Sequence, residues 1–288
     1  MRTKICDIVV EEFYTLITSI EKDFGSNYKR KVNNFLLSQM DEHRIANMVF
    51  ASSFESKSGF AIETCAKRIA RLRFGNENVP TIVNPHNLPL DINANEVKGQ
   101  IILTNINIIN GNLKGEICAY RANNMVTGSG KNRKESTLTQ SSIKRDLLPL
   151  AKKFKTNVIH AKAVDLAFFD GTNWNVCELK AGGDLDSSNA PSNVEKLLNI
   201  YIAMDLPNCN AYFATLYNKD GEGNTWKGTV KKHMNYPSMF LIGAKFWNKI
   251  LPIGITFSDF IEIYATALKE LNLNQRMNSM INKCINNM

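Results

Sequence analysis

The chain has 288 residues, of which 44% are hydrophobic and 22% are charged, a composition typical of a folded globular protein and not of a disordered one. This length suits one large domain. The formal net charge of +8 fits a nucleic-acid partner, because Lys and Arg side chains neutralise phosphates. Many basic proteins bind no nucleic acid, so the charge alone does not decide the partner.

The N-terminal segment and the cysteines predict a reduced, cytoplasmic protein. Asp7, Glu11 and Glu12 interrupt the first apolar stretch, which therefore lacks the apolar region of a signal peptide. No apolar run approaches the roughly 20 residues that span a membrane. None of the six cysteines forms a CxxC pair or lies near a histidine at zinc-ligand spacing. We therefore expect no membrane partner, no disulfide framework, no zinc site and no organic cofactor.

The first half of the chain carries mostly helical signals. Apolar residues at helical spacing predict helices over residues 9–24, 28–40, 58–74 and 138–154. In the third of these, Ser58 can cap the start and Gly75 ends the helix. β-Branched residues predict a strand over 100–109, whereas 76–95 and 125–135 have the Pro, Asn, Gly and Lys content of loops.

The second half alternates strands and helices. We expect a β-hairpin over residues 158–180, a helix over 192–204 and strands over 211–217 and 239–242. A short helix then contains Phe246 and Trp247, and a longer C-terminal helix covers 258–271.

Asp165 lies on the first strand of the expected hairpin. Because side chains alternate along a strand, one face carries three bulky apolar residues that belong in a core: Val164, Leu166 and Phe168. Asp165 occupies the opposite face between Ala163 and Ala167, where small neighbours predict an open floor.

The turn between the strands sets what Asp165 faces. If residues 170–173 form the loop, Phe169 pairs with Trp174, and Asp165 then lies opposite Glu178. A two-residue turn on Asp170 and Gly171 would shift the pairing by two residues but would keep both acids on one face. Lys180 shares that face, since it follows Glu178 by two residues.

Two opposed carboxylates repel each other, and partial burial raises the cost of keeping both charged. A divalent cation offsets this repulsion, and magnesium prefers one or two carboxylates together with waters and phosphate oxygens. The pattern therefore predicts a site for metal-assisted phosphodiester hydrolysis. The alternative is a solvated face of an edge hairpin with ordinary polar residues. Gly182 and Gly183 follow directly, where a backbone can approach a ligand closely.

This segment resembles the PD-(D/E)XK nuclease superfamily, and within it the type II restriction endonucleases. In that superfamily a helix precedes a β-hairpin with an Asp and a (D/E)-x-K motif, and a helix and a strand follow. The motif here reads Asp165 with Glu178-Leu179-Lys180, and the resemblance covers about residues 55–250. The ELKAGGDLD run looks most like the TdeIII-type group. Val164 stands where the superfamily often has Pro, a position that tolerates change.

The resemblance implies roles for the motif residues. Asp165 and Glu178 would bind Mg²⁺, and the backbone carbonyl of Leu179 would add a ligand. Lys180 would orient or deprotonate the attacking water and stabilise the developing charge at phosphorus. Superfamily members often place a Glu from the preceding helix near the metal, and Glu63 fits this role; the alternative is a solvated helix residue.

The same resemblance implies an α/β fold: a restriction-endonuclease-like core with a mixed central β-sheet flanked by helices, and additional N- and C-terminal helices. We expect a single domain over residues 1–288. It would comprise an N-terminal helical part (1–57), a catalytic core with DNA-contacting insertions (58–250) and C-terminal helices (251–288).

Cations and hydrogen-bonding side chains around the 125–135 loop predict DNA contacts; the alternative is a mobile solvated loop. The candidates are Lys131, Arg133, Lys134, Gln140, Ser141, Lys144, Arg145, Lys162, Gly182, Gly183 and Asp184. Arg133 or Gln140 could read base edges, and Lys162 is a phosphate candidate. Asp184 and Asp186 are expected to form a turn and a helix approach, or else to contact a cytosine amino group.

We therefore expect a sequence-specific endonuclease that cuts double-stranded DNA with Mg²⁺, acting as a homodimer whose twofold symmetry matches a palindromic site. One alternative is a non-specific or structure-specific nuclease of the same superfamily, which would serve in repair or junction resolution. The other is a DNA-binding protein that keeps this fold without catalysis.

Overall fold

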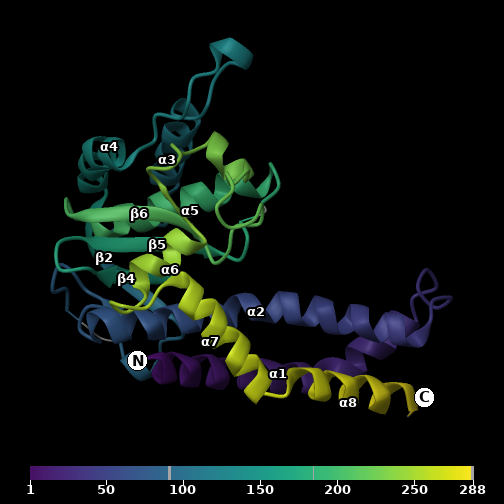
Figure 1. Ribbon diagram of the computed structural model, residues 1–288. Helices are drawn as coiled ribbons and strands as arrows, with labels where there is room; N and C mark the ends of the chain where they lie inside the picture. Colours follow the sequence, from purple (N-terminus) through teal and green to yellow (C-terminus); the bar gives the residue numbers. More distant parts are fainter. Residues whose placement is uncertain (90–91, 184, 287–288) are drawn as a thin grey trace. The chain divides into compact units, whose positions relative to one another are not determined.

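The computed structural model describes residues 1–89, 92–183 and 185–286. The chain forms two compact units (Figure 1). The first, the helical unit, combines residues 1–69 with the described residues from 252 onward, and the second, the sheet unit, comprises residues 70–251. That the two units act as a single nuclease domain stays a prediction.

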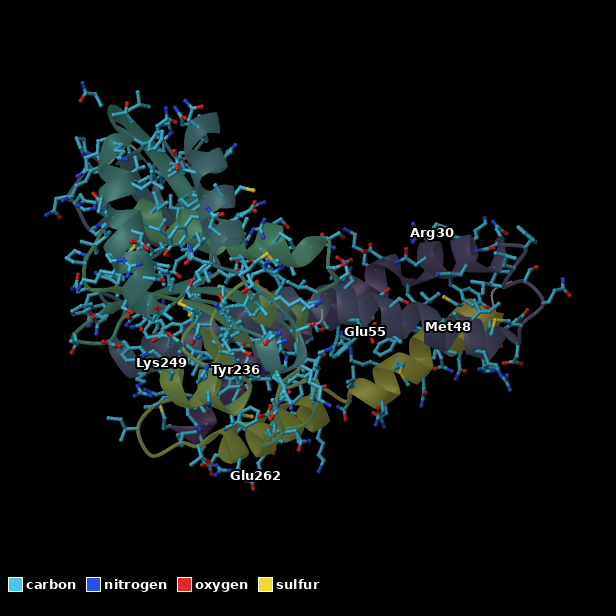
Figure 2. All side chains as sticks on the ribbon, turned by 90° about the horizontal axis from the view of Figure 1, so that it is seen from above. Arg30, Met48, Glu55, Tyr236, Lys249 and Glu262 are labelled. Carbon is cyan, nitrogen blue, oxygen red and sulfur yellow. The ribbon has the colours of Figure 1, made fainter. Side chains whose placement is uncertain are left out.

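The helical unit is built from long helices: α1 (Arg2–Val32), the part of α2 (Glu42–Phe74) that precedes residue 70, α7 (Phe257–Glu270) and α8 (Leu273–Asn286). Its core includes the edge-to-face pair of Phe13 and Tyr264, with ring centroids 5.2 Å apart. Arg30 lies on α1 of this unit, and Met48 and Glu55 lie on α2 (Figure 2).

Two expected helix boundaries in this unit were wrong. Residues 9–24 and 28 onward belong to one continuous helix, α1, and residues 34–39 form turns in which the Asn34 carbonyl accepts bonds from the Leu37 and Ser38 amides. Helix α2 begins at Glu42, where Asp41 Oδ1 accepts the Arg44 N–H at 3.2 Å. Ser58 is an interior residue whose hydroxyl bonds back to the Glu55 carbonyl, so it caps nothing.

The sheet unit contains two mixed sheets. The first has the order β1-β2-β3 and the second the order β4-β5-β6-β7. Their strands are β1 (Ile82–Val83), β2 (Gln100–Ile106), β3 (Lys155–Val164), β4 (Leu166–Phe169), β5 (Trp174–Lys180), β6 (Cys209–Thr215) and β7 (Phe240–Ile242). A mixed α/β architecture was expected, but as one central sheet.

The expected hairpin over 158–180 is shorter than predicted. β3 pairs antiparallel with β2, and only β4 and β5 form the hairpin. The chain bends at Asp165, between β3 and β4, and this bend separates the two sheets. Asp165 therefore lies at the junction of two strands and not within one.

Helices cover the sheets of this unit. They are η1 (Ala94–Glu96), α3 (Gly111–Asn123), η2 (Gly130–Asn132), α4 (Gln140–Lys153), α5 (Asn189–Met204), η3 (Thr229–Lys232) and α6 (Ala244–Ile250). Helix α5 packs on β5 and β6, and α3 and α4 pack on α5 (Figure 1). Helix α3 was not predicted, although Asn110 caps it by accepting the Asn112 and Leu113 amides.

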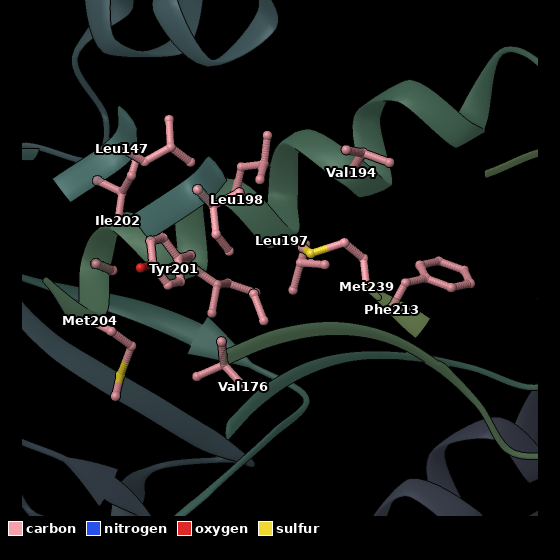
Figure 3. Close-up of a cluster of buried hydrophobic side chains, with 14 of the residues drawn as sticks. Leu147, Val176, Val194, Leu197, Leu198, Tyr201, Ile202, Met204, Phe213 and Met239 are labelled. Atoms are coloured by element: carbon pink, nitrogen blue, oxygen red, sulfur yellow. The ribbon is translucent and has the colours of Figure 1, made fainter. Parts of the chain in front are cut away.

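The main core of the sheet unit lies between α5 and the strands (Figure 3). Val194, Leu197 and Tyr201 of α5 are fully buried against strand residues such as Val176 and Phe213. Burying side chains of this size stabilises a fold by about 1.5–3 kcal/mol each. The position of α5 over the hairpin is therefore strongly determined.

Two glutamine side chains bond to strand edges. The Gln100 amide donates to the Ala167 carbonyl at 2.8 Å and accepts the Ala167 N–H at 2.9 Å, and Gln140 does the same to Ala211 at 2.7 and 3.0 Å. Asn78 adds a third contact, because its carbonyl accepts the Phe169 N–H. These contacts occupy backbone groups that no neighbouring strand reaches.

Candidate active site

The β4–β5 hairpin has the predicted register. Phe169 pairs with Trp174, and the pairing continues to Leu166 and Cys177, so its next step places Asp165 opposite Glu178. Asp170 closes the four-residue loop, since its Oδ1 accepts the backbone N–H groups of Thr172 and Asn173.

The sequence predicted an open floor beside Asp165, and this prediction was wrong. Ala167 and Val176 are fully buried in the core under α5, and Val164 belongs to the same cluster although it was expected on the opposite face with Leu166. The bend at Asp165 breaks the alternation on which that expectation rested. As a result, the Glu178 side chain is completely buried and that of Asp165 is 19% exposed.

Asp165 is fixed by the backbone of the second strand. Its Oδ2 accepts the Leu179 N–H at 2.8 Å. Within an extended strand the N–H and C=O of one residue point to the same side, so the Leu179 carbonyl faces the side on which Asp165 lies.

Two lysines contact the carboxylates. Lys180 Nζ lies 2.7 Å from Glu178 Oε1. Lys196, from α5, lies 2.6 Å from Glu178 Oε2, 2.9 Å from Glu178 Oε1 and 3.3 Å from Asp165 Oδ1. Sequence reasoning missed Lys196, although a lone cation in the largely apolar EKLLNIYIAM segment was a usable signal.

These contacts shift the acid–base equilibria of the site. Burial, followed by the charge of Asp165, raises the pKa of Glu178, and the two lysines oppose this. Burial alone would lower the pKa of Lys196, but its hydrogen bond and the charges of Glu178 and Asp165 outweigh burial and raise it. Burial and then the charge of Lys196 lower the pKa of Lys162.

The donor set fits a hard divalent cation. Glu178 Oε2 is buried and has no hydrogen bond, its close contact being the ion pair with Lys196. Within residues 1–89, 92–183 and 185–286 there is no cluster of three or more His, Cys, Asp or Glu side chains that could hold a metal. A cation here would therefore be held by two carboxylates and the Leu179 carbonyl, with water and phosphate oxygens as further ligands, which is the set that magnesium accepts.

Glu63 lies on α2 in the helical unit, whereas the carboxylate pair lies in the sheet unit. Its expected role beside the metal stays a prediction.

The predicted DNA-contacting loop is an ordered hairpin. Thr127 and Lys134 exchange backbone hydrogen bonds, and η2 forms a helical turn at the tip of this teal segment (Figure 1). Lys131 and Lys134 are exposed, and Arg133 forms an ion pair with Glu135 at 2.9 Å. These cations can reach phosphates without disturbing the core.

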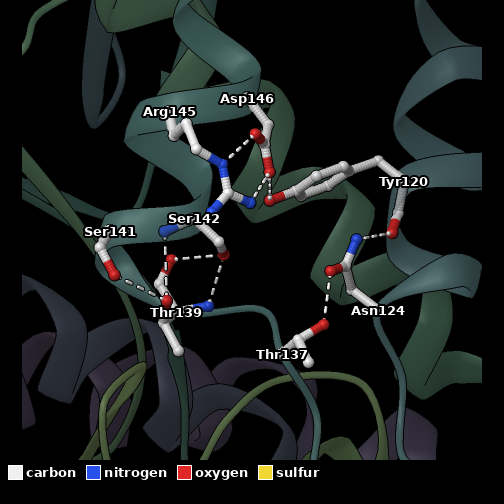
Figure 4. Close-up of polar contacts among 8 residues, drawn as sticks. All are labelled: Tyr120, Asn124, Thr137, Thr139, Ser141, Ser142, Arg145 and Asp146. Carbon is white, nitrogen blue, oxygen red and sulfur yellow. Dashed lines mark hydrogen bonds and ion pairs between the residues drawn. The ribbon is translucent and has the colours of Figure 1, made fainter.

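The candidates on α4 differ among themselves (Figure 4). Lys144 is exposed, Arg145 pairs with Asp146 at 2.6 Å, and Ser141 contacts the capping residue Thr139 at 3.1 Å. Gln140, by contrast, uses both its amide donor and its amide acceptor on the Ala211 backbone. The structure thus gives Gln140 a role in closing a strand edge.

The two glycines after Lys180 are buried. A Cβ at Gly182 would lie 2.7 Å from the Tyr217 ring. At Gly183, where φ is +71°, a Cβ would lie 2.7 Å from Thr215 and 2.8 Å from Trp226. Close packing therefore explains both glycines. Asp184 lies outside the described residues.

Asp186 lies at the approach to α5, which is one of the two positions expected for it. Its Oδ1 accepts the backbone N–H groups of Ser188 and Asn189 at the start of the helix. Lys162 lies on β3, opposite Ile102 of β2.

The carboxylate pair, its lysines and the basic hairpin are the features expected of an enzyme that cuts DNA, and the sequence comparison agrees. A family model described as a type II restriction endonuclease matches residues 1–267, so the chain is a site-specific deoxyribonuclease. That family is HinfI, and the chain belongs to it. The TdeIII-type group that the ELKAGGDLD run resembled is not the family matched. Comparisons with curated proteins and with solved structures find no match.

The family establishes the substrate and the outcome: the enzyme binds DNA and cleaves it at a specific sequence. Among the described residues, no helix is both long and apolar enough to cross a membrane. All six cysteines have free thiols.

Proposed function

We propose that this restriction endonuclease is a Mg²⁺-dependent PD-(D/E)XK enzyme whose catalytic centre is formed by Asp165, Glu178 and Lys180. The observation that carries the proposal is the convergence of two carboxylates, one of them fully buried, on a single cationic position beside the Leu179 backbone. Evolution rarely buries a carboxylate without a partner, and this pair has cations as its partners.

Each residue has a distinct part in the reaction. Asp165 and Glu178 would hold Mg²⁺, which supplies positive charge to the scissile phosphate and to the attacking water. Lys180, 2.7 Å from Glu178, is placed to orient the attacking water and to stabilise the charge that develops on the phosphorane oxygens. The Leu179 N–H keeps Asp165 facing the same point.

Double-stranded DNA would be bound through the exposed cations outside this centre. Lys131 and Lys134 in the hairpin and Lys144 on α4 have side chains in solvent and would contact phosphates. Arg133 and Arg145 are each held by a neighbouring acid, and a phosphate or a guanine edge would compete with that acid. Lys162 would contact the phosphate nearest to the carboxylates.

We infer that the enzyme acts as a homodimer, because a twofold-symmetric protein presents two equivalent centres to the two strands of a palindromic site. We also infer that it works in the cytoplasm, where incoming DNA is met. The mass from light scattering, with and without DNA, tests the first inference: a monomer in both states contradicts it.

The decisive experiment combines metal titration with DNA cleavage. Mg²⁺ binding to EDTA-treated protein is measured by calorimetry for the wild type, Asp165→Asn, Glu178→Gln and the control Glu96→Gln, whose carboxyl group is exposed on η1. We expect the first two variants to lose Mg²⁺ binding and plasmid cleavage while the control keeps both. Discrete fragments from Asp165→Asn, or cleavage that persists in EDTA, would contradict the proposal.

A further inference from the structure

Lys196 is the side chain that joins the two carboxylates. Its Nζ contacts both oxygens of Glu178, at 2.9 and 2.6 Å, and Asp165 Oδ1 at 3.3 Å. Lys180, by comparison, contacts one oxygen of Glu178. The ammonium of Lys196 therefore lies between the carboxylates, where a bound cation would be expected.

The fold fixes the backbone of Lys196 but does not enclose its side chain. Helix α5 is anchored by Asp186 at its start and by buried neighbours such as Val194 and Leu197. The Lys196 side chain is nevertheless 38% exposed, whereas that of Glu178 has no exposed surface. A lysine has four rotatable bonds and a strongly hydrated head group, so of these two charges it is the lysine that can leave for solvent.

Charge balance explains why Lys196 and a metal ion would exclude each other. In the free enzyme the charges of Asp165 and Glu178 are cancelled by those of Lys180 and Lys196. A Mg²⁺ ion added to this neutral group would meet an ammonium at close range, and the two cations would repel each other. Both cannot occupy the space between the carboxylates.

We propose that Lys196 is an internal counter-ion that holds the two carboxylates together in the free enzyme and is displaced by Mg²⁺, so that the lysine and the metal compete. This inference rests on the proposed function, in which Asp165 and Glu178 bind the metal. Lys196 is thus a positioning residue: without metal it keeps a buried carboxylate from driving the site apart.

The competition also couples the binding of Mg²⁺ to the binding of DNA. Once displaced, the Lys196 ammonium adds a positive charge to the solvent side of the centre. A DNA phosphate compensates that charge, so DNA favours the state in which the metal has replaced the lysine. By thermodynamic linkage, metal and DNA then strengthen each other's binding.

The test compares Lys196→Met with two matched variants in EDTA-treated protein that is afterwards titrated with MgCl₂. Lys196→Arg keeps the charge, and Lys162→Met removes a neighbouring charge on β3. We expect Lys196→Met to bind Mg²⁺ about tenfold more tightly than the wild type, as the loss of a competitor requires. Lys196→Arg and Lys162→Met should stay within about threefold of the wild type.

A second measurement needs no metal. In EDTA, Lys196→Met should lower the midpoint of thermal unfolding by about 5 °C, because it leaves two carboxylates, one of them fully buried, with Lys180 as their counter-ion. Adding Asp165→Asn should restore part of that loss, because it removes the repulsion.

The outcomes separate the two proposals. If wild-type Mg²⁺ affinity depends on Asp165 but Lys196→Met binds Mg²⁺ no more tightly, the competition is refuted and the proposed metal site stands. If Asp165→Asn leaves Mg²⁺ affinity unchanged, the metal site itself is refuted, and the competition falls with it. An unchanged unfolding midpoint of Lys196→Met in EDTA would refute the counter-ion role in either case.

Discussion

The carboxylate centre and the basic hairpin of residues 125–135 are both polar, yet they are organised in opposite ways. At the centre, strand pairing and the Leu179 amide position the two carboxylates, and Lys196 contacts both of them. In the hairpin, the backbone is ordered by Thr127 and Lys134, but Lys131 and Lys134 extend into solvent. The charges that we propose to perform chemistry are thus oriented in advance by the fold, whereas those that we propose to contact DNA would take their final positions from it.

The strongest test of this contrast removes one charge from the centre. Asp165→Asn should reduce the rate of cleavage by at least about a thousandfold, because it removes the negative charge of a proposed metal ligand, although the Asn side-chain oxygen can still accept the Leu179 N–H. DNA affinity should change by less than about fivefold. Cleavage rates in single turnover and gel-shift titrations measure the two effects, and Lys180→Ala should behave in the same way. Undiminished cutting by either variant contradicts the assignment.

Substitutions of two glycines compare the close packing beside the centre with the open surroundings of the hairpin. Gly183→Ala should lower the free energy of unfolding by about 3 kcal/mol, since a left-handed φ and a clash with Thr215 and Trp226 act together. Gly130→Ala also has a positive φ, but no atom lies within 4 Å of its Cβ position, so about 1 kcal/mol is expected. Urea unfolding measures both. Equal losses would mean that packing at Gly183 contributes nothing.

Gln140 tests whether a residue beside the hairpin acts on DNA or on the fold. Gln140→Leu should lower the free energy of unfolding by about 1–3 kcal/mol, because the Ala211 N–H and C=O lose their partners. The recognition sequence should stay the same, which cleavage of a library of sites can check. A relaxed recognition sequence with unchanged stability would show instead that Gln140 reads a base.

The smallest effect is expected in the hairpin. Lys131→Gln should weaken DNA binding several-fold at low salt and reduce the slope of log affinity against log salt by about 1, without changing stability. The exposed Lys269 on α7 offers a matched control, since Lys269→Gln removes the same charge from the helical unit. A slope that is identical in the wild type and Lys131→Gln would exclude a phosphate contact there.

Local signals predicted the register of the β4–β5 hairpin well and long-range contacts poorly. The register of Asp165 and Glu178 follows from a four-residue loop and strand alternation, both of which are visible in the sequence. The bend at Asp165 is not visible, because it arises where β3 pairs with β2, some sixty residues away in sequence. Lys196 was missed for the same reason: only the packing of α5 brings it to the carboxylates.

Elsewhere, helix ends were the weakest predictions. Ser58 has the right chemistry for a cap, but the apolar pattern of α2 continues through it, and Asp41 caps the helix instead. Gln140 has the chemistry of a base reader, and nothing in its neighbours reveals that a strand edge would take up its amide.

The contacts of Gln100 and Asn78 bear on how the protein assembles. Together they occupy the N–H and C=O of Ala167 and the N–H of Phe169, which β4 would otherwise offer to another chain. The hairpin that carries the carboxylates is thereby shielded from edge-to-edge aggregation. One side-chain amide and one loop carbonyl achieve this without adding a strand.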